Sequence, residues 1–310
     1  FVALNFFNLM WLDALIFLPL VAWGIDRLVI TGRTGGYFCW LLVSVLTDYY
    51  LGYMTCLFIV AYCVYMLTAE WPAGQSVRAW FQTKRHLCYR FIGASLLSVG
   101  STLVILLPTV LGMLATPKTQ GQVGNFHLIP MFGLEFFNQL GVGAGDYLQR
   151  LSHGPAIFSS SLVALLAIAY FGLPQIKFWT KLRAALLLLF LFMGMWLRGF
   201  NTIWHLMTPP SGYPFRNSFF FSFVLILIAS SAWQAGLTQL SNRWRWGTPL
   251  LLGGLMLLGS WLIPLMQTWT QSDYYASLQP INWAAVWTSL AILVVTAGLL
   301  WFGHVPPVWL

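Results

Sequence analysis

Residues 219–237 read FFFSFVLILIASSAWQAGL, a stretch without a single charged side chain. A helix needs about 20 such residues to cross the hydrocarbon core of a bilayer. Helices are expected because only a helix satisfies the backbone polar groups of a continuous apolar run inside lipid. Similar runs recur at 11–29, 37–47, 52–68, 91–115, 157–173, 184–200, 249–269 and 283–302. The sequence therefore predicts an all-α, polytopic transmembrane bundle of about nine spans.

The composition and the placement of charge agree with a membrane protein. Of the 310 residues, 59% are hydrophobic and 7% are charged, against about 25% charged in an ordinary soluble domain. The formal net charge is +8, yet nucleic acid is not expected as a partner, because the basic residues gather in alternate loops. Most of them fall near 27–33, 78–90, 177–183 and 243–245. The positive-inside rule places these loops in the cytoplasm.

The remaining loops are predicted to face outward. They hold most of the acids, namely Asp13, Asp48, Glu135, Asp146 and Asp273. Because the loops at 30–36 and 69–90 are both basic, the segment between them must cross the membrane an even number of times. TDYYLGY, at 47–53, supplies the break, so we expect two helices there, the second longer than the first. A turn-forming Asp48 and a helix-capping Asp13 are the simplest interpretations; contact with a substrate is the alternative.

The whole chain, 1–310, is expected to form one transmembrane domain of a longer protein, because no charged segment or cleavage site precedes its first apolar run. Residues 116–155 make an outer loop too long for a mere connector, with a short interfacial helix expected near 131–140. Its GVGAGD piece lacks the preceding strand and the following Lys-Ser/Thr of a phosphate loop, so nucleotide binding is not predicted. The four cysteines lack the spacing of a metal site.

Directly before the first quoted run, residues 203–218 read IWHLMTPPSGYPFRNS. Pro209 and Pro210 cannot continue a helix, so a turn is expected ahead of Arg216. An arginine at the start of an apolar helix opposes the helix dipole, and Arg216 therefore needs an anionic partner. That partner is either an outer acid or a phosphate on a substrate. His205 is predicted to face the same outward cavity, as a satisfied interfacial histidine or as a ligand or proton carrier.

Four stretches carry a family resemblance: NLMWLDALIFLPL (8–20), DYYLGYM (48–54), the loop from GLEFFNQL through SHGPAIFSS (133–161), and IWHLMTPPSGYPFRNSFFFSF (203–223). Together they resemble the YfhO family of bacterial membrane proteins over nearly the whole chain. The resemblance implies a GT-C-like fold and a multi-pass glycosyltransferase of the bacterial cell membrane. Such an enzyme adds a sugar to a cell-envelope polymer, such as teichoic acid, on the outer face. The implied partners are membrane lipid, an undecaprenyl-phosphate (polyprenyl-phosphate) sugar donor and the polymer acceptor.

The resemblance also implies roles for the residues singled out above. Fixed cations would stabilise the leaving phosphate, and the expected phosphate site is formed by Arg216, His205, Trp204, Tyr213 and Asn217. Acceptor contacts are expected from Asp13, Asp48, Tyr49, Tyr53 and Glu135; the family typically has asparagine at the position of Asp48. The general base of GT-C enzymes lies in the first outer loop, expected upstream of Phe1. Some GT-C enzymes use a divalent metal, but no residue pattern here predicts a metal or another cofactor.

Two other classes of protein remain open at this stage. A transporter or flippase of a lipid-linked sugar would show inverted repeats, or interrupted helices with ionisable groups at mid-membrane. No clear internal repeat is present, and nearly all charged residues lie at the ends of spans, which disfavours transport. A scaffold whose outer loops only bind partners predicts no convergent pocket beneath those loops.

Overall fold

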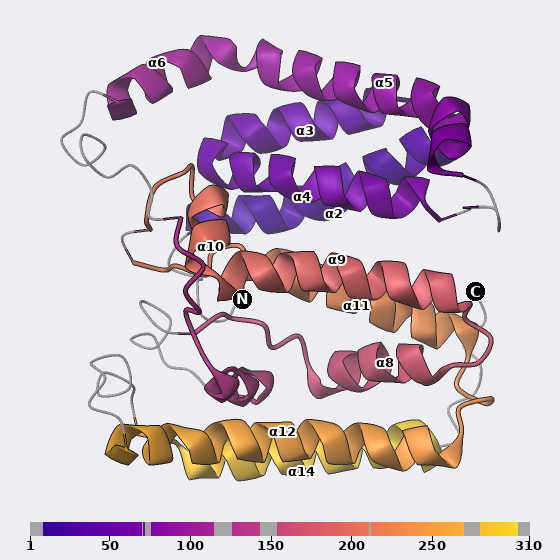
Figure 1. Cartoon of the computed structure of the whole chain (residues 1–310), viewed down its shortest axis with the longest axis vertical. Coiled ribbons are helices and arrows are strands. Elements are labelled where there is room, and N and C mark those ends of the chain that lie inside the picture. Colours follow the sequence, from indigo (N-terminus) through magenta and orange to yellow (C-terminus); the bar gives the residue numbers. More distant parts are fainter. Residues whose placement is uncertain are drawn as a thin grey trace. The chain divides into compact units, whose positions relative to one another are not determined.

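The computed structural model describes residues 9–69, 71, 76–114, 126–142, 154–210, 212–269 and 280–302 (Figure 1). All elements assigned within these ranges are helices. Six are long and apolar enough to cross a membrane, and a bent pair of helices makes a seventh candidate. Two shorter apolar helices cover further predicted spans. The predicted all-α, multi-pass membrane bundle is confirmed, and the number of nine crossings stays a prediction.

The chain folds into two compact units, which are described separately. The N-terminal unit comprises Val2–Leu128 with Gly199–Pro210, and the C-terminal unit comprises Ile129–Arg198 with Ser211–Leu310. The expectation of one transmembrane domain is not tested by this division. Each unit has its own buried apolar residues, such as Leu41 and Phe58 in the first and Leu165 and Phe220 in the second.

The N-terminal unit is a group of antiparallel apolar helices. α2 packs against α3 and α4, and α3 packs against α5. Gly24 in α2 allows the closest approach, because a Cβ there would lie 2.6 Å from the Cα of Tyr37 in α3. The helices of this unit are α2 (Leu9–Thr31), α3 (Gly35–Thr47), α4 (Tyr49–Leu67), α5 (Val77–Ser101), α6 (Leu103–Leu114) and α10 (Arg198–Trp204).

The hairpin predicted around TDYYLGY is present, with Asp48 alone separating α3 from the longer α4. Asp48 has an extended backbone, and its Oδ1 accepts hydrogen bonds from the backbone N–H groups of Tyr50, at 2.8 Å, and Leu51, at 3.0 Å. Gly52 brings the two helices together, because a Cβ at this position would lie 2.9 Å from the Cα of Val45. The turn-forming interpretation of Asp48 is confirmed in the form of an N-cap.

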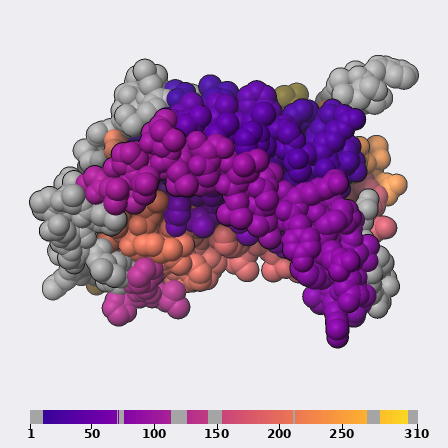
Figure 2. Space-filling view, turned by 90° about the horizontal axis from the view of Figure 1, so that it is seen from above, coloured from indigo at the N-terminus to yellow at the C-terminus, as the bar shows by residue number. Residues whose placement is uncertain are grey.

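Residues 77–90, expected in a cytoplasmic loop, are helical instead. α5 begins at Val77, where Ser76 Oγ accepts a hydrogen bond from the N–H of Ala79 at 3.3 Å. α5 and α6 are bent by 67° at Thr102. In Figure 2 these two helices, purple to magenta, form the outer surface of this part of the unit. From Ile92 onward their large exposed side chains are apolar, with Val104 84% exposed, as suits a surface that faces lipid. Before that point the exposed side chains of α5 include Arg78, Arg85 and Arg90.

The C-terminal unit is built on two neighbouring helices, α12 and α14, which lie side by side (Figure 1). α8 packs against both of them and against α11, and α11 also packs against α9. Its elements are η1 (Leu134–Leu140), α8 (Ser161–Gly172), α9 (Phe178–Trp196), α11 (Ser218–Ala235), α12 (Asn242–Trp269) and α14 (Trp283–Phe302).

The short helix expected near 131–140 is the 3-10 helix η1. It packs against α12, where Gly259 leaves room for it: a Cβ on Gly259 would lie 2.7 Å from the backbone nitrogen of Asn138. Ser260 Oγ donates a hydrogen bond to Asn138 Oδ1 at 3.1 Å. On the C-terminal side, the N–H of Val142 donates to Ser289 Oγ of α14 at 2.8 Å. The loop is therefore anchored to two helices, while Asp146 and the rest of 143–153 lie outside the described residues.

Candidate functional site

The apolar run at 184–200 is interrupted, whereas the sequence predicts one continuous helix there. α9 ends at Trp196, Leu197 is extended, and α10 follows. The break pairs with the outer loop in antiparallel fashion, Leu197 opposite Pro130. The N–H of Met131 donates to the carbonyl of Trp196 at 2.7 Å, and the N–H of Arg198 donates to that of Ile129 at 3.0 Å. A non-local backbone pairing therefore fixes the break that separates α9 from α10.

His205 and Trp204 are buried in the N-terminal unit, with 1% and 3% of their surfaces exposed. His205 Nδ1 lies 2.7 Å from the carbonyl oxygen of Asn201. Since a carbonyl can only accept, Nδ1 carries the proton, and in the neutral ring Nε2 is then the acceptor. The imidazole also meets the ring of Tyr50 edge-on, with centroids 6.1 Å apart. His205 is thus packed into the unit through Nδ1 and its ring, and the choice between a satisfied histidine and a ligand or proton carrier stays a prediction.

The start of α4 meets α10, which brings several predicted site residues together. Tyr53 Oη donates to the carbonyl of Ile203 at 2.8 Å, and Tyr50 contacts His205. Asp48 and Tyr49 begin the same helix, α4. Tyr50, which the sequence analysis did not single out, is therefore a neighbour of the predicted site. Its place could have been inferred from its spacing of three residues from Tyr53 on one helix face.

The segment after α10 has an unusual backbone. Leu206, Met207 and Tyr213 have φ angles of 58°, 60° and 48°. This left-handed region is disfavoured for residues with a side chain. Conformations of this kind cluster at functional sites, where surrounding structure holds them. The strain supports the choice of this segment as a candidate site.

Arg216 is half-buried in the C-terminal unit, and its neighbours hold it in place. Its Nη2 donates to the carbonyl of Gly212 at 3.1 Å. On one side, Phe215 belongs to a buried aromatic cluster and packs edge-on against Phe132 at 5.6 Å. On the other, Asn217 Nδ2 donates to the carbonyl of Gly194 at 3.1 Å. The guanidinium is therefore carried on a turn that is fixed at both sides.

α11 begins directly after Arg216 without a side-chain cap on its first N–H groups. Asn217 is 2% exposed and Ser218 is fully buried. In the part of the chain that the structure describes, neither Asn217 Oδ1 nor Ser218 Oγ has a hydrogen-bond partner. The sequence analysis did not single out Ser218. A serine at the start of an apolar run is a recognisable pattern, because hydroxyl groups are common at helix starts.

The other predicted acceptor contacts are placed differently. Asp13 is half-buried and lies beyond the first turn of α2, so the capping interpretation of this residue is wrong for the described helix. Glu135 is 7% exposed in the C-terminal unit, where its Oε1 accepts a hydrogen bond from the N–H of Gly133 at 2.6 Å. These geometries explain Asp48 and Glu135 as local caps, and contact with an acceptor stays a prediction for all five residues.

The predicted residues are thus divided between the two units. Asp13, Asp48, Tyr49, Tyr53, Trp204 and His205 belong to the N-terminal unit, and Glu135, Tyr213, Arg216 and Asn217 belong to the C-terminal unit. That the two groups line one outward cavity stays a prediction. In the described ranges no cluster of three or more His, Cys, Asp or Glu side chains is arranged to hold a metal ion.

Comparison with known proteins adds one finding. The family model described as bacterial membrane protein YfhO matches residues 1–306. Neither the curated proteins nor the solved structures give a match. The family match covers nearly the whole chain and agrees with its multi-pass helical structure. The chain belongs to the YfhO family of bacterial membrane proteins.

Proposed function

We propose that this chain is part of a membrane glycosyltransferase of the GT-C type. It transfers a sugar from an undecaprenyl-phosphate-linked donor to a cell-envelope polymer, such as teichoic acid, on the outer face of the membrane. Membership of the YfhO family supports this assignment at the level of the family. The observation that carries the chemistry is Arg216, a half-buried guanidinium held at the start of an apolar helix.

A lipid-phosphate donor leaves a phosphate on which negative charge builds in the transition state. Fixed cations and N–H groups stabilise such charge best in a partly dry site. Arg216 is anchored by Phe215 and Asn217. The N–H groups of Ser218 and Phe220 at the start of α11 already donate to the carbonyls of Phe215 and Asn217, whereas the buried hydroxyl of Ser218 has no hydrogen-bond partner among the described residues. The guanidinium of Arg216 and the hydroxyl of Ser218 are therefore the two donors that would meet a phosphate oxygen.

The chain offers a matched control for Arg216. Arg90 Nη1 donates to the carbonyl of Gly32 at 2.8 Å, and Gly32 has a φ of 74°, against 75° for Gly212. Arg90 therefore makes the same kind of bond on the side that the positive-inside rule assigns to the cytoplasm. If the arginine–glycine hydrogen bond were all that mattered, replacing either arginine should have the same effect on sugar transfer.

The test uses the full-length protein in vesicles with a labelled polyprenyl-phosphate sugar and an acceptor polymer. Arg216→Ala is expected to lower the transfer rate by about 10²–10³-fold, the effect of removing a charge-stabilising donor. Arg90→Ala is expected to retain transfer, and both variants should insert normally. Near-normal transfer by Arg216→Ala, or an equal loss in Arg90→Ala, would remove the phosphate assignment.

A flippase of a lipid-linked sugar is the second candidate, and the interrupted helices favour it. α5 and α6 are bent by 67°, and α9 is broken at Leu197 ahead of Arg198. Interrupted spans are a feature of transporters. At the first break, however, the flanking residues of α6 are LVILLPTVLGML, without an ionisable group. The same vesicles separate the two functions: a flippase moves the labelled donor between leaflets without acceptor, and a transferase requires the acceptor polymer for product.

A further inference from the structure

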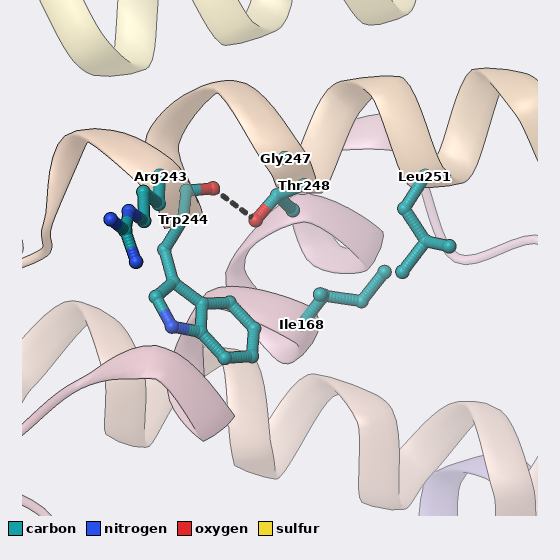
Figure 3. A pocket seen from close by; sticks show the side chains of 6 residues that line it. All are labelled: Ile168, Arg243, Trp244, Gly247, Thr248 and Leu251. Carbon is teal, nitrogen blue, oxygen red and sulfur yellow. Dashed lines mark hydrogen bonds between the residues drawn. The ribbon is translucent and has the colours of Figure 1, made fainter.

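A hollow of about 270 Å³ lies between α8 and α12 in the C-terminal unit (Figure 3). Its lining residues are Ile168, Arg243, Trp244, Gly247, Thr248 and Leu251. It is remote from Arg216. Arg216 precedes α11, which has 18 residues, and the far end of α11 at Ala235 is followed closely in sequence by the start of α12. At 1.5 Å per residue, α11 alone spans about 27 Å. The hollow is therefore separate from the candidate phosphate site.

The hollow has one charged end and one apolar end. Arg243 stands at the beginning of α12 and Leu251 lies two turns further on, about 12 Å along the helix axis. Between them, Figure 3 shows the Trp244 indole and the Ile168 side chain facing the same space. Thr248 donates its hydroxyl to the carbonyl of Trp244 at 2.6 Å, so this hydroxyl proton is already used. An occupant would need a polar, anionic head and an apolar body.

Basic and aromatic residues mark this end of the unit as a membrane interface. Gln175 Nε2 donates to the carbonyl of Gly236 at 2.8 Å, which joins the α8–α9 connection to the end of α11. The connection leads into Lys177, Lys181 and Arg183, and Arg245 follows Arg243 on α12. Phe178 and Trp179 are 71% and 69% exposed. Such a combination of cations with exposed aromatic rings is typical of the cytoplasmic boundary of a membrane.

We propose that this hollow binds an anionic phospholipid of the cytoplasmic leaflet, with its phosphate at Arg243 and part of an acyl chain along Trp244, Ile168 and Leu251. Sites that enclose a whole ligand measure about 300–1,000 Å³. An open hollow of about 270 Å³ fits part of a molecule whose remainder stays in the bilayer. A free sugar or nucleotide would fit less well, because the lining of the hollow is mainly apolar and Arg243 is the one charged residue among the described residues that line it. The anionic head matches the surplus of positive charge on this side.

The structure suggests a pair of variants that separates filling of the hollow from a change in α12 itself. Gly247 lines the hollow, and a Cβ added there meets no atom within 4 Å. Gly254, seven residues further along the same helix, also has open space around an added Cβ but does not line the hollow. Gly247→Leu should occupy the space of the acyl chain, whereas Gly254→Leu adds the same side chain elsewhere.

The test is native mass spectrometry of the full-length protein in detergent, titrated with dioleoyl phosphatidylglycerol and, separately, dioleoyl phosphatidylcholine. Wild type is expected to retain phosphatidylglycerol preferentially. Arg243→Gln should weaken that binding roughly fivefold, the contribution of one basic residue near an anionic surface. Gly247→Leu should weaken it at least as much, whereas Gly254→Leu and Arg33→Gln, a basic residue of the N-terminal unit, should match wild type.

The proposal fails if phosphatidylcholine binds as tightly as phosphatidylglycerol, because Arg243 would then have no role in selection. It also fails if Gly247→Leu and Gly254→Leu behave alike, which would mean that lipid coats the bundle without entering the hollow. Should Arg243→Gln prove unstable, the two glycine variants decide the outcome by themselves. Sugar transfer is not part of the readout, so the result is independent of the proposed function.

Discussion

Two arginines in this chain make the same bond in different settings. Arg90 and Arg216 each donate a guanidinium N–H to the carbonyl of a glycine with a positive φ, Gly32 and Gly212. Arg90 is exposed on α5 and reaches a glycine 58 positions away. Arg216 is half-buried and reaches back only four positions. The bond of Arg90 ties α5 to the connection between α2 and α3, whereas the bond of Arg216 closes a turn on itself.

The surroundings of the two bonds differ more than the bonds do. The connection between α2 and α3 has no residue with a positive φ except Gly32. The stretch leading to Arg216 has three such residues other than glycine, namely Leu206, Met207 and Tyr213. Arg90 bonds to a single positive-φ glycine in a helix connection. Arg216 follows a stretch with several disfavoured backbone angles, and such angles cluster at functional sites.

The largest effect among the predictions below is expected at Arg216, when the two arginines are compared as lysine variants. Lysine keeps the charge of arginine and loses its planar pair of donors. Arg216→Lys should lower sugar transfer at least about tenfold, since one hydrogen bond to a charged group contributes roughly 1.5–3 kcal/mol. Arg90→Lys should leave transfer unchanged. Single-turnover transfer in vesicles measures both. Equal rates for the two variants would erase the distinction between the arginines.

The next largest effect is expected on stability, at Gly32, whose carbonyl accepts the hydrogen bond from Arg90. A Cβ on Gly32 would lie 2.5 Å from Arg90 Nη1, and φ is 74°. Gly32→Ala should therefore lower the free energy of unfolding by about 1–2 kcal/mol. Gly35→Ala, at the first residue of α3, is the control, because nothing lies within 4 Å of an added Cβ. Unfolding in detergent measures both, and similar midpoints would show that Gly32 is not under this constraint.

The third prediction concerns Asp48. Its substitutions distinguish a carboxylate that only caps α4 from one that also contacts the acceptor. Asp48→Ala removes the cap of α4 and should destabilise the protein by about 1 kcal/mol. Asp48→Asn keeps a capping oxygen and should be as stable as wild type. If capping is the whole role, Asp48→Asn also keeps full transfer. A loss of transfer at unchanged stability would instead support the acceptor contact.

The smallest effect should come from relieving strain near His205. Met207 has a φ of 60° and is 49% exposed. Met207→Gly should stabilise the protein by about 0.5 kcal/mol, the difference between the left-handed penalty and the entropy that glycine loses on folding. Met207→Ala keeps the penalty and serves as the control. A destabilised Met207→Gly variant would mean that the φ angle is not a source of strain.

The sequence predicts the apolar helices well, because the membrane leaves backbone polar groups no other solution. The α3–α4 hairpin follows from charge placement alone and ends at the predicted tip. The start of α5 was predicted fourteen residues too late, since a basic segment was interpreted as a loop. Hydropathy marks the stretch that suits lipid, whereas the helix continues to Val77, where Ser76 caps it.

The features that the sequence does not reveal depend on distant partners. Gly194 lies three residues before the break at Leu197, but a single glycine inside a helix does not predict its end; the break follows from pairing with residues 129–131. Tyr62 donates to Asp26 Oδ1 at 3.0 Å across α2 and α4, a polar pair that neither helix signals by itself. Arg216 at the start of α11 was correctly predicted, because its turn and its helix are local. The contacts of its neighbours Phe215 and Asn217 with Phe132 and Gly194 could not be predicted.

The 3-10 geometry of η1 limits how this loop can vary in length between related chains. With three residues per turn, Glu135 and Asn138 stand in one buried row, and Phe136 and Gln139 stand in the next. A single inserted residue would rotate everything beyond it by about 120° and carry Asn138 away from Ser260. Insertions and deletions should therefore accumulate before His127, where the pairing with the break after α9 begins, or after Val142, and leave the register of η1 intact.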